Sequence, residues 1–145
     1  MEILVDTNVL LRASQPNQPA GVSAINAMKS LRRQQHTLLL APQNIIEFWN
    51  VCTRPGHVNG LGLSVGATER YVERLIRIFP VAIESPRIFE KWLALVVQHA
   101  VIGSRVHDAR LVALMKDHDI EGILTFNVKD FSRYEGIRPI HPNEC

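Results

Sequence analysis

Short apolar runs alternate with longer amphipathic segments along this chain. The runs predicted as strands are Ile3–Val5, 37–41, 81–84, 122–126 and 138–141. Segments in which apolar residues recur every three or four positions predict helices over about 20–35, 42–53, 64–79, 86–97 and 104–118. This alternation predicts an α/β fold: one domain over residues 1–145, with a central, mainly parallel sheet of about five short strands and helices on both faces.

Apolar stripes on two of these helices identify candidate core residues. The stripe of the helix over 64–79 is Val72, Leu75, Ile76 and Phe79. The stripe of the next helix is Phe89, Trp92, Leu93, Val96 and Val97. Because side chains three, four and seven positions apart share one face of a helix, both stripes are expected to face the core.

Composition narrows the class of protein only slightly. Hydrophobic residues make up 46% and charged residues 21% of the 145 residues, which is typical of a globular domain. The net charge of +2 is compatible with an anionic partner without requiring one. Two cysteines are too few for a disulfide framework or a zinc site. The sequence shows no signal-peptide pattern, and no apolar run approaches the roughly 20 residues of a membrane span. We therefore expect a cytoplasmic protein with no membrane segment.

One ionisable residue, Asp6, interrupts the apolar run ILVDTNVLL that begins at Ile3. Apolar runs of this length are usually bounded by turn residues and not interrupted by a charge. One interpretation is that Asp6 ends the first strand and caps the next element through its side chain. The other is that Asp6 holds a metal ion, because ligand sites in parallel sheets lie beyond the carboxyl ends of the strands.

A second carboxylate, Asp108, heads a stripe that is otherwise apolar. Leu111, Val112 and Met115 follow it at three, four and seven positions. Asp108 also lies in the first turn of its predicted helix, where the helix dipole stabilises an anion by about 0.3–1 kcal/mol. The position is compatible with a structural acid at the start of a helix and equally with a functional carboxylate.

Two further segments place polar side chains at the same predicted edge. Glu47 lies well round its helix from the apolar side chains of Phe48 and Trp49, so periodicity alone favours an exposed glutamate. Asn127 and Asp130 follow the strand over 122–126, where a polar turn with Asn127 capping a short helix is the simpler interpretation.

Together these acids predict a cation site at the carboxyl edge of the sheet. Two like charges about 4 Å apart repel by about 4 kcal/mol at an effective dielectric constant near 20, so a cation must offset them. Ligand sets made only of oxygen select a hard ion, Mg²⁺ or Mn²⁺. Such a site suits phosphodiester hydrolysis, because the metal lowers the pKa of a bound water and neutralises charge at phosphorus.

Four segments carry a resemblance to a known family: LVDTNVLL, PQNIIEFWNVCTRP followed by NGLGLS, HDARLVALM and LTFNVKDF. They resemble, in order and with the expected spacing, the motifs of PIN-domain ribonucleases and more narrowly of the VapC-type toxins of bacterial type II toxin–antitoxin systems. The resemblance extends from about residue 2 to 140. It implies an endoribonuclease that depends on Mg²⁺ or Mn²⁺, with RNA as substrate, a cognate antitoxin as protein partner and a homodimer as the assembly.

Carried over residue by residue, the resemblance assigns the first three acids of the site to Asp6, Glu47 and Asp108. It implies that Asp6 and Asp108 hold the metal ion. It also implies that Glu47 acts as a base or binds the metal through a water molecule. For Glu47 this replaces the interpretation as an exposed helix residue.

The remaining site positions carry a departure from the family. The fourth acidic position falls on Asn127, and Asp130 follows in the same motif. Many relatives have Asp where this chain has Asn127, so the site carries one negative charge fewer. Thr7, Asn8 and Thr125 match positions that in the family line the site and orient ligands or water.

Two other classes of function compete with the nuclease. A non-catalytic RNA-binding or scaffolding protein of the same fold is favoured only by Asn127. An aspartyl-phosphate phosphatase or receiver domain also places an Asp after the first strand, but it needs a second Asp two residues later or an acidic pair just before, and Asn8 and Glu2 supply neither. Basic residues that could contact phosphates, or be simply solvated, are Arg12, Arg54, Arg105 and Lys129.

Overall fold

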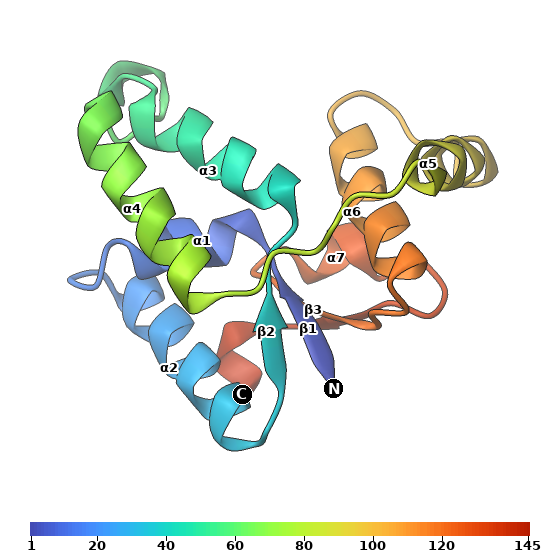
Figure 1. The fold of residues 1–145 in the computed structure, drawn as a ribbon, viewed down its shortest axis with the longest axis horizontal. Helices are drawn as coiled ribbons and strands as arrows, with labels where there is room; N and C mark the ends of the chain where they lie inside the picture. The colour runs from blue at the N-terminus through green and yellow to red at the C-terminus, as the bar shows by residue number, and fades with distance from the viewer.

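A parallel four-stranded sheet lies between two layers of helices in the computed structural model, which describes residues 1–145 (Figure 1). The strands are β1 (Glu2–Val5), β2 (Thr37–Leu39), β3 (Gly122–Leu124) and β4 (Arg138–Ile140). The helices are α1 (Thr7–Ala13), α2 (Pro19–Arg33), α3 (Pro42–Thr53), α4 (Val65–Ile78), α5 (Arg87–Gln98), α6 (Arg105–Asp117) and α7 (Val128–Phe131). Short 3₁₀ turns cover Gly56–Val58 and Pro142–Glu144.

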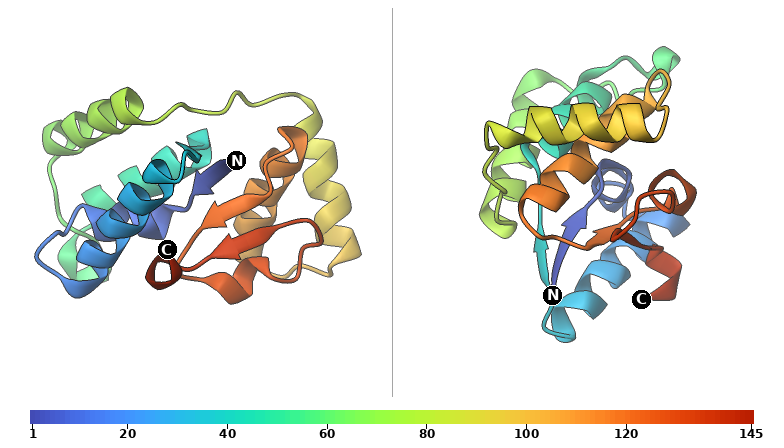
Figure 2. Two further views of the ribbon diagram at one scale, coloured as in Figure 1. Left: turned by 90° about the horizontal axis from the view of Figure 1, so that it is seen from below. Right: turned by 90° about the vertical axis from the view of Figure 1, so that its right-hand side faces the viewer.

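Alternating side chains along β1 supply both halves of the hydrophobic core. Ile3 and Val5 belong to a cluster packed against α1 to α4, whereas Leu4 belongs to a cluster packed against α5 to α7. Successive side chains of a strand point to opposite faces, so a run of three buried residues serves both layers. Figures 1 and 2 show the two groups of helices on either side of the sheet.

The strand order β2-β1-β3-β4 places a topological switch point between β1 and β3. The chain leaves β1 toward β2 on one side and later returns to β1 on the other side with β3. Leu4 and Val5 are paired in register with Ile123 and Leu124. In open parallel sheets the crevice at such a switch point, beyond the carboxyl ends of the strands, is where ligands bind. The residues that follow Val5 and Leu124 therefore occupy this crevice.

The α/β class and the parallel sheet are confirmed, but the predicted strand over 81–84 is not formed. Val81 makes only an isolated bridge to Leu40. Two backbone hydrogen bonds support it, from Leu40 to the Pro80 carbonyl (2.9 Å) and from Ala82 to the Leu40 carbonyl (2.8 Å). Beyond Ala82 the chain leaves the sheet edge, and Ile83 is 80% exposed. The sheet therefore has four strands, and the fifth is reduced to one bridge.

The helices differ from the predictions at three points. The short helix α1 was not predicted, because seven residues give too few turns to establish an apolar period. Ile76 was predicted to be core but is 53% exposed, since it lies beside the face of α4 that packs inward. On α5, Trp92 and Val96 pack against the core as expected. The other members of its stripe, Phe89, Leu93 and Val97, are 65%, 47% and 74% exposed.

None of the helices combines the length and the apolar character needed to cross a bilayer.

Candidate active site

Asp6 lies at the switch point, between the end of β1 and the start of α1. Its backbone N–H donates to the Leu124 carbonyl (2.9 Å), which continues the β1–β3 ladder by one bond. Its side chain Oδ1 accepts from the Thr7 backbone N–H (2.8 Å) and so caps α1. The structure therefore confirms the capping interpretation and also places the carboxylate on the ligand edge of the sheet.

A network of hydroxyl and amide donors holds the second oxygen of Asp6. The Thr125 hydroxyl donates to Oδ2 over 2.7 Å, and the Asn8 amide donates to the same oxygen over 3.2 Å. Asn8 also accepts from the Phe126 backbone N–H (3.2 Å), and Thr125 accepts from the Asn127 backbone N–H (3.0 Å). These bonds fix the carboxylate against β3.

Burial disfavours the ionised form of Asp6. The residue is 7% exposed, and the loss of hydration raises the pKa of its carboxyl from 3.8 to about 6. Hydrogen bonds from Thr125 and Thr7 oppose this rise, while the negative charges of Glu47 and Asp130 add to it. Asp6 is therefore a buried carboxylate that other acids surround and that a cation would stabilise.

Asp108 lies in the first turn of α6, near enough to Asp6 for the charge of Asp6 to act on it. Leu111, Val112 and Met115 are all buried as predicted, so the stripe anchors the helix and leaves Asp108 at the rim of the core. The pKa of Asp108 rises from 3.8 to about 6, first because of burial and then because of the charge of Asp6. The negative charge of Asp6 thus disfavours the ionisation of Asp108.

Glu47 is held at the site by donors from two elements. Thr7 donates its hydroxyl to Oε2 (2.8 Å), and Gln43 donates its amide to Oε1 (2.8 Å). The Gln43 amide also donates to the His107 carbonyl (2.8 Å), which ties α3 to the start of α6. The prediction of a solvated helix glutamate from periodicity is wrong, because α3 begins at the carboxyl edge of the sheet and Glu47 in its second turn bonds Thr7, the residue next to Asp6.

The last motif contributes Asp130 and the exposed Asn127. Arg105 pairs with Asp130, and its Nη1 lies 3.8 Å from Oδ2 of Asp108, so the guanidinium bridges two of the acids. The hydrogen bond to Asp130 raises the pKa of the Arg105 guanidinium, and Arg105 in turn opposes the rise in the pKa of Asp108. Asn127 occupies the cap position of α7 but makes no capping bond with its side chain.

The acids supply the type of ligand atom that a hard divalent cation prefers, but the structure does not group three of them around one point. Asp6 and Asp108 offer oxygen ligands, the type that Mg²⁺ and Mn²⁺ prefer. No three His, Cys, Asp or Glu side chains form a group that could hold a metal ion. Asp130 is engaged with Arg105 and Glu47 with Thr7, so these two acids already have partners.

Three residues of this network were not assigned by the sequence. Gln43 connects Glu47 to the start of α6, and Asn44 bonds both the Ala41 backbone N–H (2.8 Å) and the Thr7 hydroxyl (3.3 Å). Arg105 was considered only as a phosphate contact. Gln43 and Asn44 are buried next to Pro42 at the start of α3. Two neighbouring amides in a sequence give no sign of such burial, so the sequence alone could not identify these residues.

Comparisons with known proteins identify the family to which this fold belongs. Residues 3–137 match the PIN domain family, and a search among curated protein sequences gives no match. The chain therefore belongs to the PIN domain family. Among solved structures it is similar to VapBC-1 from nontypeable Haemophilus influenzae, with a TM-score of 0.71 at 15% identity and 99% of each chain covered.

Two further structures show the same likeness of fold. VapBC2 from Rickettsia felis, bound to a DNA fragment from its promoter, gives a TM-score of 0.70 at 14% identity, with 97% of this chain and 98% of that chain covered. A toxin–antitoxin complex from Klebsiella pneumoniae gives a TM-score of 0.61 at 22% identity, with 99% of each chain covered.

Proposed function

We propose that this protein is a divalent-metal-dependent endoribonuclease. One observation carries the proposal: Asp6 and Asp108 lie near each other at the carboxyl edge of a PIN-domain sheet, and burial and neighbouring negative charge raise the pKa of each to about 6. A buried acid next to a half-buried acid whose ionisation it disfavours is a typical arrangement for a functional site. The resemblance of four sequence motifs to PIN-domain ribonucleases supports RNA as the substrate.

Each residue of the network then has a role in phosphodiester hydrolysis. Asp6 and Asp108 would hold Mg²⁺ or Mn²⁺, and the bound ion would lower the pKa of a water ligand and neutralise charge at phosphorus. Glu47, oriented by Thr7 and Gln43, accepts a proton from the attacking water or positions that water. Thr125 keeps the Asp6 carboxylate in place through its 2.7 Å hydrogen bond.

Cleavage of single-stranded RNA tests this proposal. We expect EDTA to abolish cleavage, Mg²⁺ or Mn²⁺ to restore it, and Asp6→Asn or Asp108→Asn to lower the rate by at least about a hundredfold. Asp117→Asn is the matched control, because Asp117 lies at the far end of α6 and bonds Ser85 and Arg87. Cleavage that persists in EDTA would refute the mechanism. Binding of RNA without cleavage would favour the non-catalytic alternative.

We also propose that the protein is the toxin of a toxin–antitoxin pair. The similar structures include a toxin–antitoxin complex, and this chain covers nearly the whole length of the chain that it matches in each structure. Expression of the wild-type chain should arrest growth of a bacterial host, and Asp6→Asn at equal protein level should relieve the arrest. Co-expression of a small neighbouring gene should relieve it as well if that gene encodes the antitoxin. Equal growth with both chains would count against the toxin function.

An apolar groove between α1, α2 and α4 supports a protein partner of acidic character. The groove encloses about 250 Å³, and its floor includes Phe48 and Leu75. Its rim carries three basic residues: Lys29, Arg32 and Arg74. An amphipathic antitoxin helix with acidic residues beside its apolar face complements this groove in shape and charge. Arg74→Glu should weaken antitoxin binding and leave RNA cleavage unchanged.

Homodimerisation remains an expectation from the family resemblance. Analytical ultracentrifugation of the purified chain measures it directly, and a monomer at micromolar concentration would exclude a stable dimer.

A further inference from the structure

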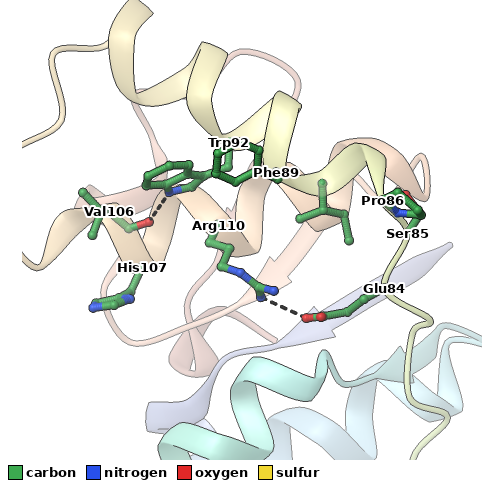
Figure 3. Close-up of a pocket in the computed structure, with 9 residues that line it drawn as sticks. Glu84, Ser85, Pro86, Phe89, Trp92, Val106, His107 and Arg110 are labelled. Carbon is green, nitrogen blue, oxygen red and sulfur yellow. Dashed lines mark hydrogen bonds and ion pairs between the residues drawn. The ribbon is translucent and has the colours of Figure 1, made fainter.

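A second cavity lies between α5 and α6, and its lining includes His107, the residue before Asp108. It encloses about 450 Å³, within the range of about 300–1,000 Å³ that small-molecule sites occupy. In Figure 3, Phe89 and Trp92 project from α5, and Arg110 reaches from α6 toward Glu84. The cavity thus combines an aromatic wall with a polar pair.

The aromatic wall consists of Phe89 and Trp92. Their ring centroids are 5.9 Å apart and their planes are inclined by 32°, so neither ring covers the other fully. Trp92 is fixed by a 2.8 Å hydrogen bond from its indole N–H to the Val106 carbonyl, whereas Phe89 is 65% exposed. An exposed aromatic ring next to an anchored one offers a planar surface on which an unpaired nucleobase can stack.

The polar pair has hydrogen-bonding capacity to spare. Arg110 donates through Nη1 to Glu84 Oε1 (2.9 Å) and to Gln43 Oε1 (3.2 Å), which leaves its other N–H groups and the second oxygen of Glu84 without a partner in the chain. Both side chains are a little over one-third exposed, at 38% and 37%. A guanidinium donates well to O6 and N7 of guanine, and a carboxylate can accept from its N1–H and N2–H groups. Guanine therefore complements this pair better than adenine or a pyrimidine.

Gln43 connects this cavity to the proposed catalytic acids. Its amide nitrogen donates to Glu47 and to the His107 carbonyl, and its oxygen accepts from Arg110. His107 lines the cavity and immediately precedes Asp108 in the chain. A base bound here would belong to a nucleotide next to the phosphodiester at Asp108.

We propose that this cavity binds an unpaired guanine base of the RNA substrate, stacked on Phe89 and hydrogen-bonded by Arg110 and Glu84. The inference rests on the proposed nuclease function, whose substrate preference it specifies. The cavity would select the position of cleavage, since the cleaved phosphodiester is the one that lies at the acids when guanine occupies the cavity.

Cleavage kinetics on short RNAs that contain a single guanosine, inosine or adenosine test this preference. We expect wild-type cleavage next to guanosine, with a higher KM for inosine and adenosine. Phe89→Ala should raise KM by about tenfold or more with a smaller change in kcat, because the loss of one stacking side chain weakens base binding. Glu84→Gln should reduce the preference for guanosine over inosine, which lacks the N2 amino group. Val97→Ala, an exposed residue farther along α5, is the matched control and should leave KM unchanged.

A binding measurement separates failure of this inference from failure of the nuclease proposal. The chain has two tryptophans, so Trp49→Phe leaves Trp92 as the only indole reporter in the cavity. Guanosine monophosphate should quench its fluorescence more strongly than uridine monophosphate, and Phe89→Ala should weaken the quenching. If wild type cleaves RNA but Phe89→Ala retains KM and base preference, the guanine pocket is refuted and the nuclease stands. If wild type cleaves no RNA, the nuclease fails, and equal quenching by both nucleotides refutes the pocket as well. A change of oligomeric state in Phe89→Ala without a change in base preference would assign the cavity to a protein interface instead.

Discussion

The substitution Asp108→Asn separates a functional carboxylate from a structural one through its effect on stability. Asparagine has nearly the same shape as aspartate but carries no charge. The pKa of Asp108 is raised from 3.8 to about 6, so the folded protein disfavours the ionised carboxylate. At about 1.4 kcal/mol per pKa unit, full ionisation costs at most about 3 kcal/mol of folding free energy. The side chain is 29% exposed and lies near Arg105, so screening reduces the expected cost to about 1–2 kcal/mol.

In EDTA at pH 8, Asp108→Asn should therefore melt above wild type. For a chain of this size 1 kcal/mol corresponds to about 2–4 °C, so removal of a cost of about 1–2 kcal/mol should raise the melting temperature by about 2–8 °C. The difference should disappear with falling pH. The penalty on the folded protein develops as pH rises from about 4 to about 6 and is complete above that, because only then is the raised carboxyl ionised. Near pH 4 Asp108 is protonated in the folded wild type, and the two proteins should melt alike.

The same substitution at Asp117 on the same helix should have the opposite sign. Hydrogen bonds from Ser85 and Arg87 lower the pKa of Asp117, so its ionised form stabilises the folded protein. Asp117→Asn should melt below wild type at pH 8, and the difference should shrink as pH falls and Asp117 becomes protonated. An Asp108→Asn protein that melts lower than wild type in EDTA at pH 8 would refute the argument and make Asp108 a structural helix-start acid.

Three further predictions concern the surroundings of this pair. Arg105→Gln removes the cation between Asp108 and Asp130, so the protein should melt at a lower temperature in EDTA at pH 8, and the pKa of Asp108 should rise further. Carboxyl NMR measures that pKa, and an unchanged titration would contradict the bridging role. Thr125→Val removes the 2.7 Å hydrogen bond to Asp6, so the unfolding free energy from urea titrations should fall by about 1–3 kcal/mol and the pKa of Asp6 should rise. Stability equal to that of wild type would mean that this hydrogen bond contributes nothing. Mg²⁺ should raise the melting temperature of wild type at pH 8 by mass action, and the rise should be smaller below pH 6, where Asp6 and Asp108 are protonated. The rise should also be smaller in Asp108→Asn, and an equal rise in both proteins would place the ion elsewhere.

Local sequence determined most of the elements of this fold. Apolar runs locate four strands, and helical periods locate five of the seven helices, because those five helices contain enough residues to show a period. Ser64 caps α4 through the Ala67 backbone N–H (3.1 Å), as a Ser before an amphipathic segment predicts. The order of motifs also pointed to Asp6 and Asp108 as partners, since residues that follow parallel strands or begin the helices between them meet at one edge of the sheet.

Only the tertiary structure decided which faces are buried and which polar groups meet. The helical period of α5 is the same whether Phe89 faces the core or an open cavity, and only the position of α5 at the end of its layer leaves that ring exposed. The period of α3 likewise turns Glu47 away from the core, and its contacts with Thr7 and Gln43 arise because α3 begins at the carboxyl edge of the sheet. Periodicity reports the direction of a side chain relative to its own helix axis, whereas burial and hydrogen bonding depend on what other elements bring to that side.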